Sequence, residues 1–436
     1  MSPMGKVCVI GIWHLGMVAS ACLADLGYVV VGVDKDLEKV KGLNRGTSVL
    51  FEPGIEELLA KNISAQRLSY TTDLPQALKG AQYTLITYDT PVNDRDEVEL
   101  SELLTTASQL AQYLDNDSTI IVSSQVPVGT CEQIEGIIRQ ANPALRFDIA
   151  YSPENLRLGR AIGRFQNPQA IIIGANSAST LNRVKQFFEP IKAAKLTMDL
   201  RSAEMTKHAL NAFLATSISF INEIANLCDG VGADALKVAE ALRLDERIGP
   251  KAMLTPGLGF AGGTLARDLK ILNDISSKLD YKAYLVDAVL KINERQNRQV
   301  VQRLQSFVGS LENLTIGVLG LTYKAGTSTL RRSSALEIIR ELVARGAKVK
   351  AYDPHADLGE VKLHHDFEFC SDAYEVAKDS DGLVIVTEWP EFKDLDFPLI
   401  KSLMRKPIIF DTKNMLDSER MNELGFLYLG IGRGKN

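Results

Sequence analysis

One glycine-rich stretch combines conformational freedom with polar groups that could serve a substrate. Residues 257–268 read GLGFAGGTLARD, with four glycines in the first seven positions. Because glycine has no Cβ and tolerates positive φ, such a backbone can approach a ligand closely. Thr264, Arg267 and Asp268 then offer a hydroxyl, a cation and a carboxylate. None of them is a strong nucleophile at neutral pH without an activating base, so the stretch has the composition of an active-site loop without its reactive group.

A second glycine turn follows the first apolar stretch of the chain. Residues 11–16 read GIWHLG, where the fingerprint of a dinucleotide-binding βαβ unit reads G-x-G-x-x-G. Trp13 occupies the position of the middle glycine, which normally lets the backbone approach the pyrophosphate. Asp34, at the end of the next apolar stretch, can accept hydrogen bonds from an adenosine ribose and would repel a 2′-phosphate. Gly11, Gly16 and Asp34 therefore predict NAD binding, with Trp13 beside the cofactor.

Two parts of the chain alternate apolar strands with helices and could position these residues. Residues 1–198 and 310–436 each contain an apolar strand, a glycine turn, a helix and further apolar strands. Residues 199–309 carry apolar residues at helical spacing. We predict an α/β fold with two Rossmann-like parallel-sheet domains joined by a central region of long helices. The central region is also expected to pair two copies into a homodimer, because twofold pairing is the commonest form of oligomer.

The composition excludes several classes of protein. The 436 residues are 45% hydrophobic and 24% charged, as in an ordinary globular protein. The formal net charge of −5 gives no general attraction to nucleic acids or acidic membranes. Five scattered cysteines without paired spacing argue against disulfides and structural zinc, and fit a reducing, cytoplasmic location. We expect no secretory signal, no membrane span and no metal site.

Six motifs resemble those of the UDP-glucose/GDP-mannose dehydrogenase family. They are YSPENLRLG (151–159), AEMTKHALNAFLATSISFINE (203–223), RIG (247–249), the stretch 257–268, LGLTYK (319–324) and LRRS (330–333). Members of this family use NAD to oxidise the C6 alcohol of a nucleotide sugar to a carboxylate, through a thioester on a cysteine. The resemblance implies an NAD-dependent oxidoreductase of polysaccharide biosynthesis, with NAD in the first domain and a nucleotide sugar, in the first place a UDP-sugar, in the last.

The resemblance also implies roles for individual residues. Lys207 and Asn211 match the pair that holds the reacting oxygen, where a cation and an amide donor stabilise alkoxide charge. Asp268 matches the carboxylate that orders a water and the lysine, and Glu154 matches the glutamate that assists thioester hydrolysis. Arg247 resembles the arginine that reaches the sugar nucleotide of the other subunit. We further expect at the nucleotide-sugar site Leu156, Phe260, Gly263, Tyr323, Lys324 and Lys413, and at the cofactor site Thr90, Ser124 and Arg331.

Several departures from the family pattern fall on the acyl-forming chemistry. Thr264 stands where the family has its cysteine, and Gln125 replaces a water-binding threonine. Leu158 replaces a second glutamate, and Lys413 replaces the arginine of a D-x-R-N motif. A thiol has a pKa of about 8.5, whereas a threonine hydroxyl stays protonated, so a thioester at Thr264 is implausible.

These departures favour two-electron oxidation of the nucleotide sugar to an aldehyde or ketone, or a transient oxidation that returns the hydride. Two alternatives stay open. A full UDP-sugar 6-dehydrogenase could oxidise a bound aldehyde hydrate without a thioester, with Gln125 or Glu154 positioning the water. The protein could also be a non-catalytic binder of NAD and sugar nucleotides.

Overall fold

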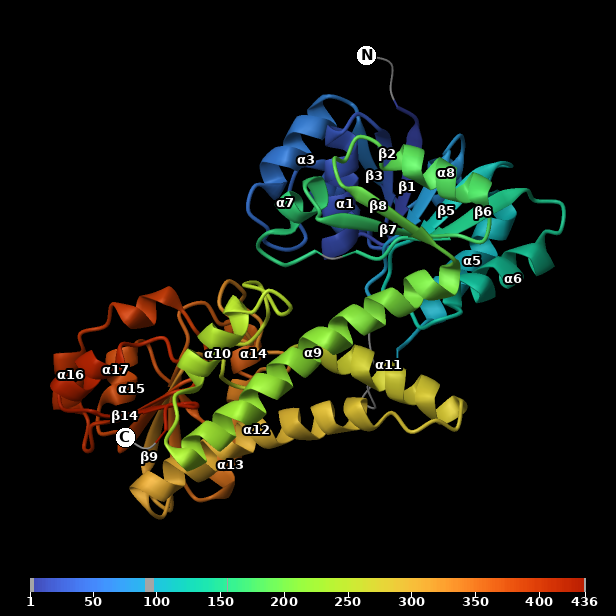
Figure 1. Ribbon diagram of the computed structural model, residues 1–436. Helices are drawn as coiled ribbons and strands as arrows, with labels where there is room; N and C mark the ends of the chain where they lie inside the picture. Colours follow the sequence, from blue (N-terminus) through green and yellow to red (C-terminus); the bar gives the residue numbers. More distant parts are fainter. Residues whose placement is uncertain (1–3, 91–97, 155, 435–436) are drawn as a thin grey trace. The chain divides into compact units, whose positions relative to one another are not determined.

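The computed structural model describes residues 4–90, 98–154 and 156–434, and the chain divides into two compact units, residues 1–209 and 210–436. Figure 1 colours the first unit from blue to green and the second from green to red. Each unit is built around one sheet with helices on its faces, and a long helix leads from the first unit into the second. The predicted fold class is thus confirmed. The three-part division at residues 198 and 309 stays a prediction.

Unit 1 is built on an eight-stranded sheet in the order β3-β2-β1-β4-β5-β6-β7-β8. Its strands are β1 (Lys6–Ile10), β2 (Val29–Val33), β3 (Leu68–Thr71), β4 (Tyr83–Ile86), β5 (Ser118–Val122), β6 (Phe147–Tyr151), β7 (Ala170–Gly174) and β8 (Ala194–Met198). Its helices are α1 (His14–Asp25), α2 (Leu37–Asn44), α3 (Ile55–Ser64), α4 (Leu74–Leu78), α5 (Ser101–Tyr113), α6 (Thr130–Ala141), α7 (Ala161–Gln166), α8 (Ala178–Phe187) and the start of α9 (Leu200–Val231).

The sheet of unit 1 departs from the predicted parallel arrangement at one place. Strands β6 and β7 meet antiparallel, whereas the other neighbouring strands are parallel. The described residues between β6 and β7 form only the six-residue helix α7, and no full crossover helix of the kind that joins parallel neighbours. The sheet of unit 1 is thus parallel except where β6 and β7 meet.

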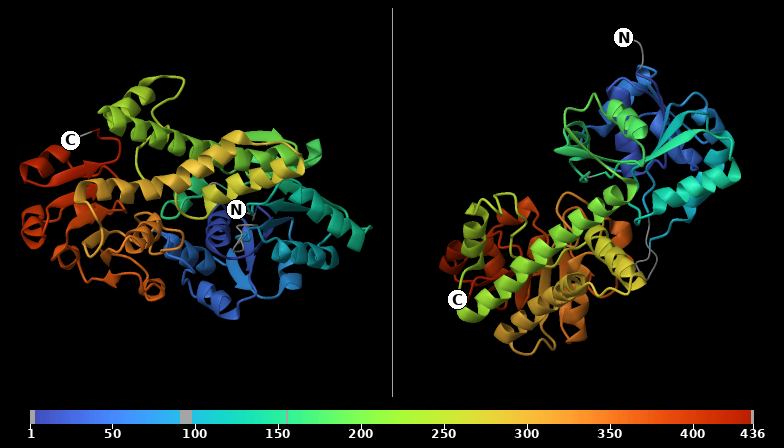
Figure 2. Two further views of the ribbon diagram at one scale, coloured as in Figure 1. Left: turned by 90° about the horizontal axis from the view of Figure 1, so that it is seen from below. Right: turned by 45° about the vertical axis from the view of Figure 1, so that its right-hand side comes forward.

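Unit 2 contains a six-stranded parallel sheet in the order β11-β10-β9-β12-β13-β14. Its strands are β9 (Thr315–Leu319), β10 (Lys348–Tyr352), β11 (Glu368–Phe369), β12 (Gly382–Ile385), β13 (Ile408–Asp411) and β14 (Leu427–Gly430). Its helices are α10 (Ala235–Leu244), α11 (Thr264–Lys278), α12 (Tyr284–Val308), α13 (Ser334–Ala344), α14 (Leu358–Val361), α15 (Ala373–Ala377), α16 (Phe397–Leu403), α17 (Ser418–Glu423) and a 3-10 turn at Pro390–Lys393. The part of α9 in this unit packs along α12, and the two helices run side by side in both views of Figure 2.

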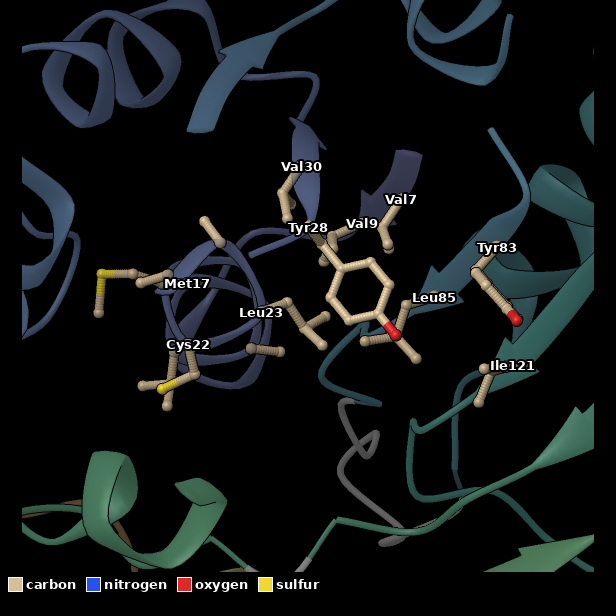
Figure 3. Packing of buried hydrophobic residues seen from close by; sticks show 14 of the residues in the cluster. Val7, Val9, Met17, Cys22, Leu23, Tyr28, Val30, Tyr83, Leu85 and Ile121 are labelled. Atoms are coloured by element: carbon tan, nitrogen blue, oxygen red, sulfur yellow. The ribbon is translucent and has the colours of Figure 1, made fainter. Parts of the chain in front are cut away.

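Helix α1 fixes the first glycine turn because it packs on the sheet through nearly all of its length. Every residue from Gly16 to Ala24 is buried. Met17 and Leu23 belong to one core cluster with Val9 of β1 and with Tyr28 (Figure 3). Small side chains let the helix approach the strands closely, and the alanines among them also favour helix formation. The start of α1 therefore has a rigid place at the end of β1.

In each sheet, the strand that comes first along the chain is followed by a glycine turn. Gly11 follows β1 with a φ of +90°, and Gly320 follows β9 with a φ of +94°. A Cβ on Gly11 would lie 2.7 Å from the ring of Tyr88, and a Cβ on Gly320 would lie 2.4 Å from Thr387 Cβ. Both the left-handed backbone and the lack of space require glycine at these two positions.

We expect Gly11→Ala to destabilise unit 1 and Gly136→Ala to stabilise it. The first change forces a left-handed backbone and a clash, which together cost about 3 kcal/mol. Gly136 lies inside α6, and an alanine methyl group there would meet no other side chain within 4 Å, so the substitution should gain about 0.5–1 kcal/mol. Urea unfolding followed by circular dichroism measures both changes, and equal midpoints for the two variants would contradict the turn geometry.

Candidate active site

The first glycine turn has the backbone form of a dinucleotide-binding turn. Asp34, just after β2, accepts a hydrogen bond at Oδ2 from Ile12 N (3.1 Å) and another from Lys39 Nζ (2.9 Å). A Cβ on Gly16 would lie 2.2 Å from Gly11 O, so glycine alone lets α1 start so close to the strand. The N-terminus of α1 follows the turn directly and offers amide groups to an anion. The turn, α1 and the strand-end carboxylate fit the adenosine diphosphate part of NAD.

Trp13 places a large side chain beside this turn. It immediately precedes α1 in an extended conformation, and 44% of the residue is exposed. Lys39 Nζ lies 5.9 Å from the centroid of its ring, and the same ammonium binds Asp34. The indole therefore flanks the carboxylate at the adenosine end of the turn and does not pack into the core.

The corresponding turn of unit 2 cannot bind a dinucleotide in the same way. Asp353, at the end of β10, accepts at Oδ2 from Leu321 N, Thr322 N, Thr322 Oγ1 and Trp389 Nε1 at 2.8–3.0 Å. These donors leave Oδ2 without room for a ribose hydroxyl. The next helix, α13, begins only at Ser334, so no helix start follows the turn. The two sheets are similar, but the strand-end carboxylate of unit 2 is already occupied by hydrogen bonds from its own unit.

Lys207 and Glu154 lie together in unit 1. Lys207 is on α9 and is only 6% exposed. Its Nζ donates to Glu154 O at 2.6 Å and lies 3.8 Å from Glu154 Oε1. Glu154 follows β6, and its Oε2 accepts from Leu156 N at 2.5 Å. The Lys207 ammonium is therefore buried next to the Glu154 carboxylate.

The loop after β5 is held by residues that the sequence analysis did not assign. Glu204, fully buried on α9, accepts from Gly129 N (2.6 Å) and Cys131 N (2.9 Å), and burial raises the pKa of its carboxyl group. His208 Nε2 hydrogen-bonds Val126 O at 2.9 Å. The spacing of Glu204 and His208, one helical turn apart, is the sequence signal that could have found them.

The same loop carries Ser124, expected at the cofactor site, and Gln125, which replaces a water-binding threonine. Thr90, also expected at the cofactor site, follows β4 and bonds to this loop. Thr90 Oγ1 donates to Gln125 O at 2.7 Å, so the threonine supports the loop backbone. Ser124 Oγ makes a long contact of 3.5 Å with Ile86 O. Both residues and Gln125 are buried.

Unit 2 brings Asn211 and Asp268 together. Asn211 Nδ2 donates to Asp268 Oδ2, and Asp268 is fully buried on α11. Thr264 is the first residue of α11, one turn before Asp268, and it is exposed. Lys207 and Asn211 are four residues apart on α9, a spacing that places both on one face of the helix.

The glycine-rich stretch packs on the loop that follows β9. A Cβ on Gly262 would lie 3.3 Å from the ring of Tyr323, and Gly262 N donates to Arg332 O at 3.1 Å. Phe260 N donates to Asn293 Oδ1 at 2.6 Å. Burial raises the pKa of the Tyr323 hydroxyl.

Two lysines of unit 2 surround one carboxylate. Lys413 Nζ binds Glu388 at 2.9 Å. Burial alone would raise the pKa of Glu388, but Lys413, its hydrogen bonds and Lys324 together hold that pKa below its ordinary value. Lys324 Nζ also lies 5.6 Å from the ring centroid of Tyr323. This charged group lies beyond the carboxyl ends of the strands, where ligands bind in such sheets.

The remaining predicted residues lie at the surface or in the core. Arg247 is exposed and forms a two-pronged pair with Asp245 at 2.7 and 2.9 Å. Leu156 packs against the core cluster of unit 1. Arg331 and Gly263 are exposed in unit 2. Within the described ranges, no group of three or more metal-ligating side chains exists and no helix is long and apolar enough to cross a membrane.

Models of one family match all three regions of the chain. The NAD binding domain of the UDP-glucose/GDP-mannose dehydrogenase family matches residues 5–192, its central domain residues 201–295 and its UDP binding domain residues 317–418. The chain belongs to the UDP-glucose/GDP-mannose dehydrogenase family. The resemblance drawn from the motifs is thus confirmed.

Full-length relatives agree with this family. UDP-glucose 6-dehydrogenase TuaD of Bacillus subtilis is 38% identical over 99% of this chain and 94% of its own. UDP-glucose 6-dehydrogenase of Rhizobium meliloti is 36% identical over 98% of this chain and 99% of its own. The solved structure of a UDP-glucose dehydrogenase from the archaeon Pyrobaculum islandicum superimposes with a TM-score of 0.90 at 31% identity, over 99% and 98% of the two chains.

As a UDP-glucose/GDP-mannose dehydrogenase family member, the protein is an NAD-dependent oxidoreductase of nucleotide sugars. The predictions of NAD as cofactor, of enzyme activity and of a nucleotide-sugar substrate are confirmed. The roles of individual site residues stay predictions, although the structure places Lys207 with Glu154 and Asn211 with Asp268.

In this member of the family, we expect Asp34→Asn to weaken NAD binding about tenfold and to reduce the preference for NAD over NADP. The amide offers one acceptor fewer to the ribose and no longer repels a 2′-phosphate. Calorimetry with both dinucleotides measures the change. Asp73→Asn, which alters a helix-capping carboxylate elsewhere in unit 1, is the control and should leave both affinities unchanged. An unchanged preference in Asp34→Asn would contradict the assigned turn.

Proposed function

We propose that the protein oxidises one CH–OH group of a UDP-sugar with NAD and releases the carbonyl compound. The observation that carries this proposal is Thr264, which stands at the exposed start of α11 where the family pattern has its cysteine. Threonine has no sulfur and its hydroxyl has no accessible anionic form at neutral pH, so Thr264 supports neither a thioester nor an equivalent covalent adduct. UDP-glucose is the first sugar to test, because the relatives that span the whole chain are named for it.

None of the five cysteines of this chain can replace the catalytic cysteine of the family. All five are buried and unpaired. Burial raises the pKa of Cys8 and Cys22 to about 12 and that of Cys370 to about 11, and it also raises those of Cys131 and Cys228. At neutral pH their thiolate fractions are negligible, and the thiolate is the nucleophilic form. The buried free thiols also fit the predicted cytoplasmic location.

Oxidation of the alcohol needs a hydride acceptor, a base and groups that stabilise the alkoxide. NAD accepts the hydride when bound. Lys207, buried beside Glu154, supplies the positive charge that stabilises the developing alkoxide. For the same step we assign the amide donor to Asn211 and the proton acceptor to its partner Asp268, from which the proton passes to water. Because the Lys207 ammonium is shielded from water, its charge stabilises the alkoxide more strongly and lowers the barrier to hydride transfer.

The second oxidation of the family reaction has no equivalent support. It requires an adduct on the carbonyl carbon, either to a thiolate or to water. Thr264 provides no thiolate, and Gln125 and Leu158 replace a threonine and a glutamate of the family pattern. The reaction therefore ends at the carbonyl, with one hydride transferred for each sugar.

We expect one NADH for each UDP-sugar consumed, with a product that has lost two hydrogens. Absorbance of NADH and mass spectrometry of the sugar nucleotide measure the two quantities together. Thr264→Ala should keep this ratio, because the hydroxyl takes no part in the hydride transfer. Thr264→Cys should add a covalent sugar adduct to the protein mass. Two NADH and a uronic acid from the unaltered protein would contradict the proposal.

We also propose that two copies form a homodimer through α9. Exposed apolar side chains follow one stripe of this helix, at Leu210, Phe213, Phe220, Leu227 and Val231. Their spacing of three, seven, seven and four residues keeps them on one face, as in a helix-pairing seam. The opposite face is already buried against the core of unit 2. A second copy of the same stripe is its matching partner, because a twofold axis pairs a surface with itself.

We expect the double substitution Phe213→Glu and Phe220→Glu to convert the dimer into a monomer. Two carboxylates for each helix would meet their copies across the twofold axis. Light scattering coupled to size-exclusion chromatography measures the mass. Leu244→Glu is a control, because this residue is 82% exposed but lies on α10. A wild-type protein of monomer mass would contradict the proposed pairing. Since Arg247 resembles the arginine that reaches the sugar nucleotide of the other subunit, the monomer should also have a higher KM for the UDP-sugar.

A further inference from the structure

Three arginines lie on the segment that follows Glu154 in unit 1. Arg157, Arg160 and Arg164 are separated by three and four residues. Arg160 N donates to Arg157 O at 2.9 Å and Arg164 N donates to Arg160 O at 3.1 Å, so successive turns of backbone carry them. No hydrogen bond or ion pair reaches any of their guanidinium groups from the described residues. Partial desolvation, together with repulsion from Arg164 and Arg160, lowers the pKa of Arg157.

The local sequence leaves these charges uncompensated. No aspartate or glutamate occurs from residue 155 to residue 188, in a chain whose formal net charge is −5. Ala161, Ile162 and Phe165 of the same segment pack into the core cluster with α1. The apolar side chains thus fix the segment, whereas Arg157 and Arg160 are exposed. Three like charges on a fixed segment lose free energy through repulsion unless an anion binds them.

The segment is fastened directly to the first glycine turn. Glu52, with a side chain that is almost completely buried, accepts from Gly159 N (2.8 Å) and Ala161 N (2.7 Å). The same carboxylate binds His14 Nε2 at 3.0 Å, and His14 is the first residue of α1. Arg160 therefore sits between the two residues that Glu52 ties to the start of α1. Figure 1 shows α7 beside α1, and the two helices share the core cluster.

The glycine turn itself lacks one element of diphosphate binding. A glycine at position 13 would let backbone amides approach the diphosphate, but Trp13 stands there with its side chain exposed. Guanidinium groups bind phosphate oxygens in a two-pronged manner and reach further than a backbone amide. Arginines anchored at the start of α1 can therefore replace contacts that the tryptophan prevents.

We infer that Arg157, Arg160 and Arg164 bind the diphosphate of the dinucleotide from the side of α7, in compensation for Trp13 at the glycine turn. The inference rests on NAD binding in unit 1 and is independent of where the oxidation stops. A diphosphate is also present in a nucleotide sugar, but the link through Glu52 and His14 to the glycine turn favours the dinucleotide.

The test compares wild type with the triple variant Arg157→Gln, Arg160→Gln and Arg164→Gln. Calorimetry measures the binding of NAD, of ADP-ribose, which keeps the diphosphate without nicotinamide, and of adenosine, which has no phosphate. We expect at least a tenfold loss of affinity for NAD and ADP-ribose at low salt, a smaller difference at high salt, and unchanged adenosine binding. The three single variants should each show part of the loss, which keeps the test available if the triple variant does not fold.

A matched control removes three other arginines of unit 1, all of them exposed and paired, namely Arg139, Arg146 and Arg201. This control should bind NAD and ADP-ribose within twofold of wild type. Equal binding of ADP-ribose by the test variant and wild type would overturn the inference. A loss for UDP-glucose without a loss for ADP-ribose would also overturn it, since the arginines would then serve the sugar nucleotide. Two NADH per sugar would refute the proposed reaction and leave this inference intact, whereas a wild type that binds no ADP-ribose would refute both this inference and the assigned turn.

Discussion

Carboxylates on or beside regular elements hold the loops of both units by accepting hydrogen bonds from backbone amides. Glu52 holds residues 159–161, Glu204 holds residues 129–131 and Asp353 holds the turn after β9. Asp411 does the same for Lys413 N and Leu416 N. Hydrogen bonds from backbone amides to a carboxylate are strong. A buried carboxylate without such bonds destabilises the fold by about 2–5 kcal/mol. These loops are therefore fixed before any ligand binds.

The residues that this chain keeps from the family pattern and Thr264, which departs from it, differ in how firmly the structure holds them. Lys207 and Glu154 lie on elements whose loops are held in place, and Asn211 is bonded to a fully buried Asp268. Groups fixed in this way can stabilise an alkoxide without reorganisation, which is the main requirement of hydride transfer. Thr264, in contrast, begins a helix at the surface of its unit and has no ionisable group. Under the proposed function, these fixed groups serve one oxidation, and Thr264 offers no nucleophile for a second.

Much of the fold and part of the site could be predicted from local sequence. The strand–turn–helix order, Gly11 and Asp34 indicate a dinucleotide-binding sheet, because these features depend on residues close in the chain. The antiparallel meeting of β6 and β7 could not be predicted, since it depends on how a short connection crosses a sheet. Glu52 escaped notice for a similar reason, because the two backbone amides that it binds lie more than 100 residues away. The family roles come from motif resemblance, and the structure adds the contacts that make them physically reasonable.

Oxidation that stops at the carbonyl is the property that most distinguishes the proposed reaction from that of the family. The most direct measurement is to treat the completed reaction of the protein, NAD and UDP-glucose with borodeuteride and to determine the mass of the sugar nucleotide. A carbonyl product is reduced back to the alcohol and gains a single carbon-bound deuterium, which is the result that the account predicts. A carboxylate is not reduced, so an unlabelled uronic acid would contradict the account and show that the second oxidation proceeds without a cysteine.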